Sequence, residues 1–254
     1  MESGQAILLR SFAGDMNVVV VGASGGIGQA LTMRLARSSA VGRIMAYSRS
    51  RPAPRHPKIR HQRVDLTDEA TIASAAEAVD AQEMALDLVF VASGILHDGE
   101  ALRPEKTWRA LEGVALERVY QVNAIGPALV AKHFLPLLAR DRKSVFAALS
   151  ARVGSISNNQ LGGWHAYRAS KAALNMLLRT FAIELAWRNP RAVCVGLHPG
   201  TVDSRLSAPF QANVPKGKLF TPGFAASRLL DVLDRVTPED SGKVFAWDGE
   251  MIPP

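Results

Sequence analysis

Tyr167 and Lys171 are the residues whose types and spacing most directly suggest proton chemistry. They lie four positions apart in the string HAYRASKAALNML, which has strong helix propensity, so both side chains are predicted on one face of a helix. A nearby ammonium favours the phenolate and lowers the pKa of a phenol from its usual value of about 10. Such a phenol can pass a proton to a carbonyl oxygen while hydride reaches the carbonyl carbon. The spacing alone also fits a solvated pair on a helix, so the context decides.

A run of glycines near the N-terminus, in VVVVGASGGIGQAL, suggests a second kind of chemistry. Gly22, Gly26 and Gly28 fall between a predicted strand and a predicted helix, where backbone N–H groups and a helix N-terminus can bind a pyrophosphate. The spacing differs from the usual dinucleotide fingerprint, because Ser24 stands two residues after the first glycine, and no P-loop Lys-Ser/Thr follows. A tight turn without a ligand is the alternative. We predict a dinucleotide site that includes Ser24 and Ile27 with these glycines.

The end of the second predicted strand indicates which dinucleotide is bound. NAD sites usually carry an acidic residue there for the ribose 2′-hydroxyl, whereas a basic residue suits a 2′-phosphate. The sequence has Ser48 and Arg49 at this point. NADP(H) is therefore predicted, with NAD(H) as the alternative; Arg49 would bond the phosphate, with Arg51 or Arg55 in support. The basic run over 49–63 could instead be a solvated loop, and nucleic acid fits it less well because interleaved aromatic residues are missing.

The composition of the 254-residue chain indicates a globular protein. Hydrophobic residues make up 48% and charged residues 21%, which argues against disorder and against a fibrous repeat. No apolar run approaches the roughly 20 residues that span a bilayer, and the N-terminus lacks the features of a secretory signal. The single cysteine, Cys194, excludes a disulfide within the chain, and the six histidines show no metal-ligand spacing. We expect a cytoplasmic protein with no metal and no membrane partner.

Strand-like and helix-like segments alternate along the sequence, which is typical of a doubly wound parallel sheet. We predict an α/β single-domain Rossmann fold of about seven strands with helices on both faces. Residues 1–15 are predicted as a flexible N-terminal appendage and residues 16–254 as one dinucleotide-binding catalytic domain. The predicted strands cover 17–21, 43–48, 60–64, 86–92, 144–150, 192–197 and 244–247, and the predicted helices cover 26–37, 68–80, 104–139 as one helix or a pair, 165–188 and 223–236.

The longest segment without clear periodicity covers 201–221, and long ordered loops often form lids or binding loops. It mixes lysines with apolar residues such as Leu206 and Phe210, which suggests a partly apolar substrate. Trp164 could line the same pocket or could simply pack at the edge of a helix.

The glycine turn, the Tyr-Lys pair and the string HPGTV at 198–202 occur in an order and at separations that resemble the short-chain dehydrogenase/reductase family over about residues 17–250. The strings GSISNNQLGGWHAYRASKAALNM and LHPGTVDSRL are most similar to C-factor-like and Sniffer-type carbonyl reductases. The resemblance implies an NADP(H)-dependent oxidoreductase that reduces an aldehyde or ketone to an alcohol. It assigns the general acid/base to Tyr167 and a bond to the nicotinamide ribose to Lys171.

The resemblance also implies roles for other matching residues. Asn123, in VYQVNAIGPAL, would help to hold a water in the proton relay to Lys171. Asp65 would lie beside the adenine, although it could equally cap the following helix. Ala92-Ser93-Gly94 stands where the family usually has Asn-Ala-Gly, so the glycine keeps its place and the asparagine is replaced. The remaining cofactor-binding residues implied are Leu66, Ala92, Ser93, Gly94, Tyr167, Pro199, Gly200, Val202 and Ser204.

The string LSARVGS departs from the family at the serine that binds the substrate. That serine is usually the second of two at the end of the fifth strand, and here Ser150 is followed by Ala151. Three accounts stay open: Ser150 serves, Ser155 serves, or no serine does. We predict Ser150. Because losing one oxyanion donor costs on the order of 100-fold or more in rate, the outcome bears on the efficiency of the enzyme.

Two other functions compete with a carbonyl reductase. A non-catalytic dinucleotide-binding signalling module is suggested by the missing serine and by Ser93, but Asn123, Tyr167 and Lys171 all remain. A sugar-nucleotide epimerase would need a substantial C-terminal domain, for which the chain after Pro199 is too short. The resemblance further implies a small-molecule carbonyl or alcohol substrate, no nucleic-acid partner, and a homodimer or homotetramer formed through the helices of 104–139 and 165–188.

Overall fold

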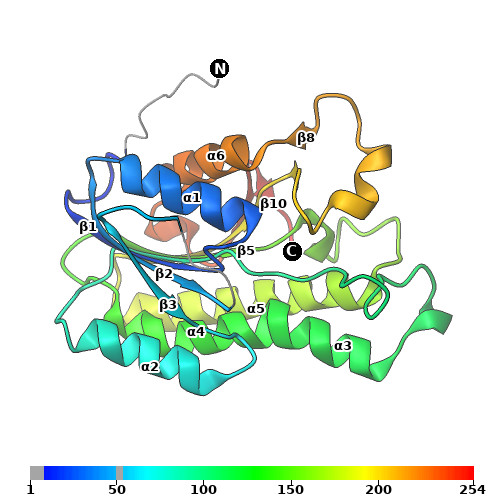
Figure 1. Ribbon diagram of the computed structural model, residues 1–254, viewed down its shortest axis with the longest axis horizontal. Coiled ribbons are helices and arrows are strands. Elements are labelled where there is room, and N and C mark those ends of the chain that lie inside the picture. Colours follow the sequence, from blue (N-terminus) through cyan, green and yellow to red (C-terminus); the bar gives the residue numbers. More distant parts are fainter. Residues whose placement is uncertain (1–8, 50–53) are drawn as a thin grey trace.

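The computed structural model describes residues 9–49 and 54–254, and a single sheet forms the centre of this part of the chain (Figure 1). Seven strands are parallel, and an eighth, β10 (Met251–Ile252), pairs antiparallel with β9. The order across the sheet is β10-β9-β6-β5-β4-β1-β2-β3. The parallel strands are β1 (Met16–Val21), β2 (Val41–Ser48), β3 (Ile59–Arg63), β4 (Leu88–Val91), β5 (Ser144–Leu149), β6 (Ala192–His198) and β9 (Val244–Ala246). The predicted α/β Rossmann fold is confirmed, with β10 as an addition too short to show a sequence pattern.

Helices cover both faces of the sheet (Figure 1). The predicted helix over 104–139 is a pair whose regular part begins at Gly113, because Thr107 caps a separate single turn, η1 (Trp108–Ala110). The α-helices are α1 (Gly26–Arg37), α2 (Glu69–Asp80), α3 (Gly113–Tyr120), α4 (Gly126–Phe134), α5 (His165–Arg188) and α6 (Pro222–Arg235). In the ranges that the structure describes, no helix is both long and apolar enough to cross a bilayer.

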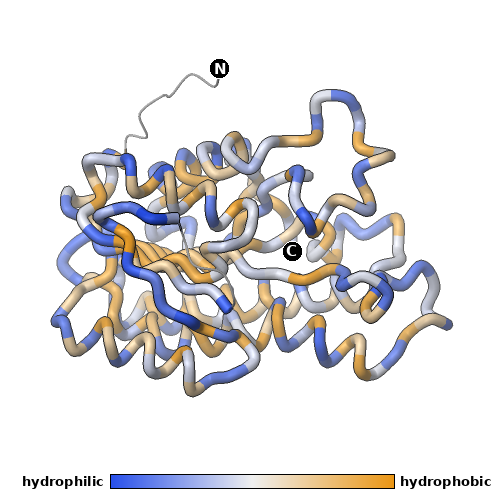
Figure 2. The backbone as a smooth tube through the Cα atoms, viewed as in Figure 1, coloured by the Kyte–Doolittle hydropathy of each residue, from blue (hydrophilic) through white to orange (hydrophobic). Residues whose placement is uncertain are grey.

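The side chains of β1 alternate between two separate hydrophobic cores, one on each face of the sheet. Val18 and Val20 pack on one side with residues of α1 and α6, including Leu31 and Leu229. Val19 and Val21 pack on the other side with residues of α2, α4 and α5. Since successive residues of a strand face opposite sides, a strand covered on both faces must be apolar throughout. The residues of the central strands are accordingly hydrophobic (Figure 2).

Residues 9–15 are part of the folded body, so the prediction that 1–15 form a flexible appendage is wrong for this segment; residues 1–8 lie outside the described residues. Leu9 and Phe12 are buried in the core that contains α6. The Ser11 amide donates to the Asp234 carboxylate at 2.8 Å, and Lys143 Nζ donates to Ser11 Oγ at 2.8 Å. Apolar burial of two side chains stabilises the docked segment.

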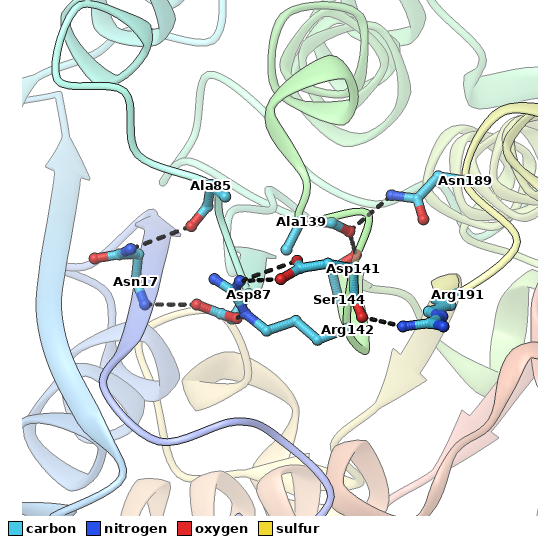
Figure 3. A network of polar contacts seen from close by, with 9 residues as sticks. All are labelled: Asn17, Ala85, Asp87, Ala139, Asp141, Arg142, Ser144, Asn189 and Arg191. Carbon is cyan, nitrogen blue, oxygen red and sulfur yellow. Dashed lines mark hydrogen bonds and ion pairs between the residues drawn. The ribbon is translucent and has the colours of Figure 1, made fainter.

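A buried carboxylate joins the strands at the edge where the parallel strands begin (Figure 3). Asp87 is 1% exposed and directly precedes β4. Its oxygens accept from the Asn17 amide at 2.8 Å and from Arg142 Nε at 2.6 Å, which raises the pKa of that guanidinium. Asp87 therefore connects the start of β1 and the segment before β5. Ligands of open α/β sheets bind at the opposite edge, outside the carboxyl ends of the strands, so this network supports the fold and leaves the site free.

Candidate active site

The glycine turn between β1 and α1 has the close packing that a pyrophosphate site needs. Gly22 has a φ of +85°, and a Cβ on it would lie 2.6 Å from Ser93 Oγ. A Cβ on Gly28 would overlap the carbonyl oxygen of Gly22, so only glycine lets α1 approach the turn this closely. Ser24 and Ile27 are half-buried in the same turn. Helix α1 has no side-chain cap and no acidic residue in its first turn, so its N-terminal N–H groups suit an anion.

The ribose end of the predicted site lies at the ends of β2 and β3. Ser48 is buried, and its Oγ lies 2.8 Å from Nε2 of His61 on β3. Arg49 follows with an exposed side chain. Partial burial acts to raise the pKa of Asp65, but hydrogen bonds from Thr67 and the charges of Arg49 and Arg63 outweigh it and lower that pKa. The supporting residue Arg51 lies outside the described residues, whereas Arg55 is described and exposed.

Asp65 holds its own turn and does not cap α2. Its Oδ1 accepts from the amide and the hydroxyl of Thr67, at 3.1 and 2.8 Å. The N-cap of α2 is Asp68, which accepts from the Ala70 amide. Leu66 is buried next to Gly126 at the start of α4. Its second oxygen, Oδ2, forms an ion pair with Arg63 Nη2 at 3.9 Å, so both oxygens of this carboxylate have protein partners.

Asn123 connects the loop after β4 to α5. It is fully buried in η2 (Gln121–Ile125), a π-helical turn between α3 and α4, and such turns often mark functional sites. Its Oδ1 accepts from the Ile95 amide at 2.8 Å, and its Nδ2 donates to the Ile95 carbonyl at 2.8 Å and to Ser170 Oγ at 3.1 Å. A Cβ on Gly94 would lie 3.5 Å from Asn123 Oδ1 and 3.6 Å from Lys171 Nζ. Three of the predicted residues therefore meet at Gly94, which follows Ala92 and Ser93 at the end of β4.

Tyr167 and Lys171 are both buried in the first two turns of α5, with exposed fractions of 9% and 2%. Lys171 Nζ lies 5.8 Å from the centre of the Tyr167 ring and donates to the Leu149 carbonyl at 2.7 Å. Burial raises the pKa of Tyr167 to about 12 and lowers that of Lys171 to about 8. Desolvation thus raises the phenol pKa in this structure, whereas the ammonium was expected to lower it.

The hydroxyls of the two serines near the end of β5 are hydrogen-bonded to residues other than Tyr167. Ser150 Oγ donates to Asn175 Oδ1 at 2.6 Å. Ser155 is buried, and its hydroxyl accepts from the Asn158 amide at 3.2 Å and lies 3.4 Å from the Pro254 carbonyl oxygen. Ala151, in extended backbone, packs in one apolar cluster with Tyr167. Because neighbouring residues of extended backbone face opposite sides, this geometry favours the account in which no serine lies beside the phenol.

Trp164 lies next to Tyr167 in an uncommon backbone conformation. Its φ is +51°, and the rings of Trp164 and Tyr167 meet edge to face with centroids 6.4 Å apart. A left-handed conformation costs a non-glycine residue about 1–2 kcal/mol. Glu105, which is buried, offsets this cost: its carbonyl accepts from the Trp164 amide at 2.5 Å, and its carboxylate accepts from the Ala166 amide at 3.2 Å.

The segment predicted to contact substrate contains more structure than its sequence pattern indicated. Pro199 and Gly200 follow β6, and Val202 ends β7 (Thr201–Val202), which pairs with β8 (Leu219–Phe220). A 3₁₀ segment, η5 (Ala208–Asn213), lies between them. A Cβ on Gly26 would lie 3.4 Å from Ser204 Cβ, so this segment reaches back to the glycine turn. The predicted nicotinamide-side residues and the predicted pyrophosphate turn therefore share one edge of the sheet.

Several residues of the site could not be found from the sequence. Trp164, Ser48 and Ser150 are bonded by Glu105, His61 and Asn175, respectively, across 13 to 59 positions of the chain. None belongs to a motif with recognisable spacing. Among the described residues, no group of three or more His, Cys, Asp or Glu side chains is arranged to hold a metal ion.

Comparisons with known proteins identify the family. A family model described as short chain dehydrogenase matches residues 16–215. The chain is 36% identical over 149 residues to C-signal of Myxococcus xanthus, covering 58% of this chain and 84% of that protein. It is 30% identical over 189 residues to 1-hydroxy-2-glutathionyl-2-methyl-3-butene dehydrogenase of Rhodococcus sp. (strain AD45), covering 74% of this chain and 77% of that one.

Solved structures agree with this assignment. The NADPH-bound carbonyl reductase from chicken fatty liver superposes with a TM-score of 0.82 at 25% identity, covering 99% of this chain and all of that one. The carbonyl reductase Sniffer of D. melanogaster has the same fold, with a TM-score of 0.80 at 20% identity over 95% of this chain and 100% of that chain. The predicted resemblance is confirmed, and the chain belongs to the short-chain dehydrogenase family of oxidoreductases.

Proposed function

We propose that this oxidoreductase uses NADP(H) to reduce an aldehyde or ketone to an alcohol, with Tyr167 as the proton donor. The observation that carries the proposal is the burial of Tyr167 and Lys171 on one face of α5, next to Gly94 at the carboxyl edge of the sheet. A buried phenol beside a buried ammonium is suited to proton transfer. The retained Asn123, Tyr167 and Lys171 argue against the non-catalytic signalling module as the alternative.

The residues present fit the cofactor. The uncapped N-terminus of α1 suits a pyrophosphate, and Ser48 and Arg49 suit a 2′-phosphate. The carbonyl reductase from chicken fatty liver, which is similar to this chain, has NADPH bound. The remaining predicted residues, from Asp65 to Ser204, would hold the adenine and nicotinamide ends. When bound, NADPH supplies the hydride that reaches the carbonyl carbon and leaves as NADP⁺.

The chain's own residues supply the proton. The Tyr167 hydroxyl donates to the carbonyl oxygen and transfers its proton as that oxygen becomes the alcohol. Lys171, whose Nζ is anchored on the Leu149 carbonyl, stabilises the phenolate that remains. Asn123 fixes the loop carrying Gly94 and Ile95 against α5, which keeps the proton donor in position.

The pH dependence of reduction is expected to follow Lys171. Because its pKa in the folded protein is about 8, the ammonium form is lost above that pH, and kcat/KM for reduction should fall there. Tyr167, with a pKa of about 12, stays protonated over the same range. Initial rates from pH 6 to 10 measure this fall in kcat/KM. In Lys171→Met the activity should be low and should no longer fall near pH 8. If the fall persists in the variant, it must come from the titration of another group.

The substrate-binding serine can be tested by a pair of substitutions. We expect Ser150→Ala to change kcat/KM by less than about twofold, because its hydroxyl is engaged with Asn175. Ala151→Ser should raise kcat/KM by about tenfold, since it adds a donor beside Tyr167, and such donors are worth about 100-fold or more when optimally placed. Steady-state kinetics of both variants measure these changes and test whether Ser150 binds the substrate. A loss near 100-fold in Ser150→Ala would instead restore Ser150 to the role first predicted for it.

We propose assembly into a homodimer or homotetramer through the outer face of α5. Met176, Ile183 and Trp187 recur at helical spacing on this face and are 67%, 50% and 87% exposed. Exposed apolar side chains gathered on one helix are typical of a protein interface. We further propose one dinucleotide-binding domain, which includes the docked residues 9–15 as well as 16–254, and a cytoplasmic location. The latter rests on the single cysteine, Cys194, which is buried.

A further inference from the structure

The proton donor lies against a wall of apolar side chains that come from four separate segments. We call this set the Tyr167 wall: Leu96, Ala151, Val153, Trp164, Leu206 and Phe210. Leu96 follows β4, Ala151 and Val153 follow β5, Trp164 precedes α5, and the last two belong to the segment after β7. A substrate whose carbonyl oxygen reaches the Tyr167 hydroxyl must therefore place its neighbouring atoms near this wall.

Several polar side chains around the wall are already paired with protein groups, whereas Nδ1 of His165, which directly follows Trp164, is buried without a hydrogen-bond partner among the described residues. Ser150 Oγ is bonded to Asn175, and His97 Nε2 lies 2.9 Å from the Arg205 carbonyl oxygen. Asp98 forms ion pairs with Arg118 and, at 3.5 Å, with Arg205. A sugar or a carboxylate next to the carbonyl has more polar atoms than this one nitrogen can pair, so it would have to break these interactions to pair the others. An apolar group would not, so the surroundings of Tyr167 favour an apolar substituent.

Aromatic rings are stacked within this wall. The Trp164 ring meets Tyr167 edge to face on one side, and its centroid lies 4.9 Å from that of Phe210 on the other. Phe210 also meets the His97 ring at 5.7 Å, nearly at a right angle. These are the offset and edge-on geometries that aromatic pairs prefer. The Trp164 ring therefore packs against an aromatic partner, Phe210, and lies next to the proton donor, Tyr167.

The two sides of the Trp164–Phe210 pair differ in how firmly they are held. Trp164 is fixed in a left-handed conformation after Gly162 and Gly163, which also have positive φ, and Glu105 bonds its amide. Phe210 lies in η5, a 3₁₀ segment in which Ala208, Pro209 and Ala212 are exposed. Segments with few buried contacts open at low free energy. Of the two rings, Phe210 is therefore the one that would have to move, while Trp164 stays in place. A strained residue held by its surroundings is also a recognised mark of a functional site.

We infer that the substrate is an aryl aldehyde or aryl ketone, whose ring packs against Trp164 in the place that Phe210 occupies in this structure. This inference rests on the proposed function. Trp164 is then the residue that determines specificity, and Tyr167, in the first turn of α5, donates to the oxygen of the carbonyl group attached to that ring.

The test compares benzaldehyde with cyclohexanecarbaldehyde, which has the same ring size without aromaticity. The wild-type kcat/KM with NADPH should be at least about tenfold higher for benzaldehyde. Trp164→Leu should lower that ratio about tenfold, mainly through a higher KM for benzaldehyde, and Trp164→Phe should keep most of it. Leu and Phe carry the same backbone cost at position 164, so only the aromatic ring differs. The control, Trp108→Leu, removes an exposed tryptophan of η1 and should leave the ratio unchanged.

A binding measurement keeps the inference separate from the proposed activity. Saturation-transfer NMR of the wild-type protein with NADP⁺ should show stronger transfer to benzyl alcohol than to cyclohexylmethanol, and Trp164→Leu should abolish the difference. A wild-type ratio near one in kinetics, or equal transfer to the two alcohols, would overturn the inference even if both aldehydes were reduced. Absence of turnover with every carbonyl, together with preferential transfer to benzyl alcohol, would overturn the proposed activity and leave the aromatic site supported.

Discussion

Tyr167→Phe is expected to lower kcat for carbonyl reduction by about 1,000-fold or more while the affinity for NADPH stays within about threefold. The variant loses the hydroxyl that donates the proton, and general acid catalysis typically contributes 100- to 10,000-fold. Its ring stays in place, because the contacts of Tyr167 with Trp164 and Ala151 are made by the ring. Single-turnover reduction separates the chemical step from product release, and calorimetric titration measures NADPH binding.

Tyr120→Phe is the matched control for this substitution. Tyr120 ends α3 and is half-buried outside the site, so the same loss of a hydroxyl there should leave kcat unchanged. Turnover retained in Tyr167→Phe would remove Tyr167 from the proposed chemistry. An equal loss in both variants would point to a general effect on the fold.

Arg49→Ala is expected to raise the Kd for NADPH by about 30- to 100-fold and to leave the Kd for NADH within about threefold. A charge-assisted hydrogen bond to a phosphate contributes more than a neutral one, on the order of 1.5–3 kcal/mol. Arg49 directly follows Ser48 and is exposed, so its removal costs the protein no core packing. Titration of the wild type and the variant with both dinucleotides measures the change.

Arg60→Ala provides the control, because Arg60 is an exposed arginine of the same basic stretch on β3. Its removal should reduce the affinity for NADPH by less than about threefold. An equal change for NADPH and NADH in Arg49→Ala would contradict the assignment of Arg49 to the 2′-phosphate. A large effect of Arg60→Ala would point to the summed charge of residues 49–63 in place of one specific contact.

Much of the fold could be predicted because its signals are local. The runs that form β1 and β5 are apolar on both faces, and α5 begins and ends where its helical pattern does. The start of the helix pair over 104–139 was missed because a capped single turn precedes Gly113. The docking of residues 9–15 depends on partners in α6, more than 200 positions away, which no local pattern reveals.

The site divides in the same way. The glycine turn and the Tyr-Lys pair have short, fixed spacings, so their positions followed from the sequence. The environment of the phenol could not be predicted from the sequence. Trp164 is held by Glu105 and covered by Phe210, which lie 59 and 46 positions away in the chain. Whether Ser150 could be the substrate-binding serine depended on which of two adjacent side chains, Ser150 or Ala151, faces Tyr167. A one-residue shift in extended backbone reverses that outcome.

The central claim is that hydride passes from NADPH to a carbonyl carbon at this site. It is tested most directly with NADPH carrying deuterium at both hydrogens of nicotinamide C4, incubated with the wild-type protein and benzaldehyde. Mass spectrometry should find benzyl alcohol with one deuterium on its carbinol carbon, in an amount equal to the NADP⁺ formed. NADPH consumed without deuterium in the alcohol, or no alcohol from benzaldehyde or any other aldehyde or ketone, would contradict the account.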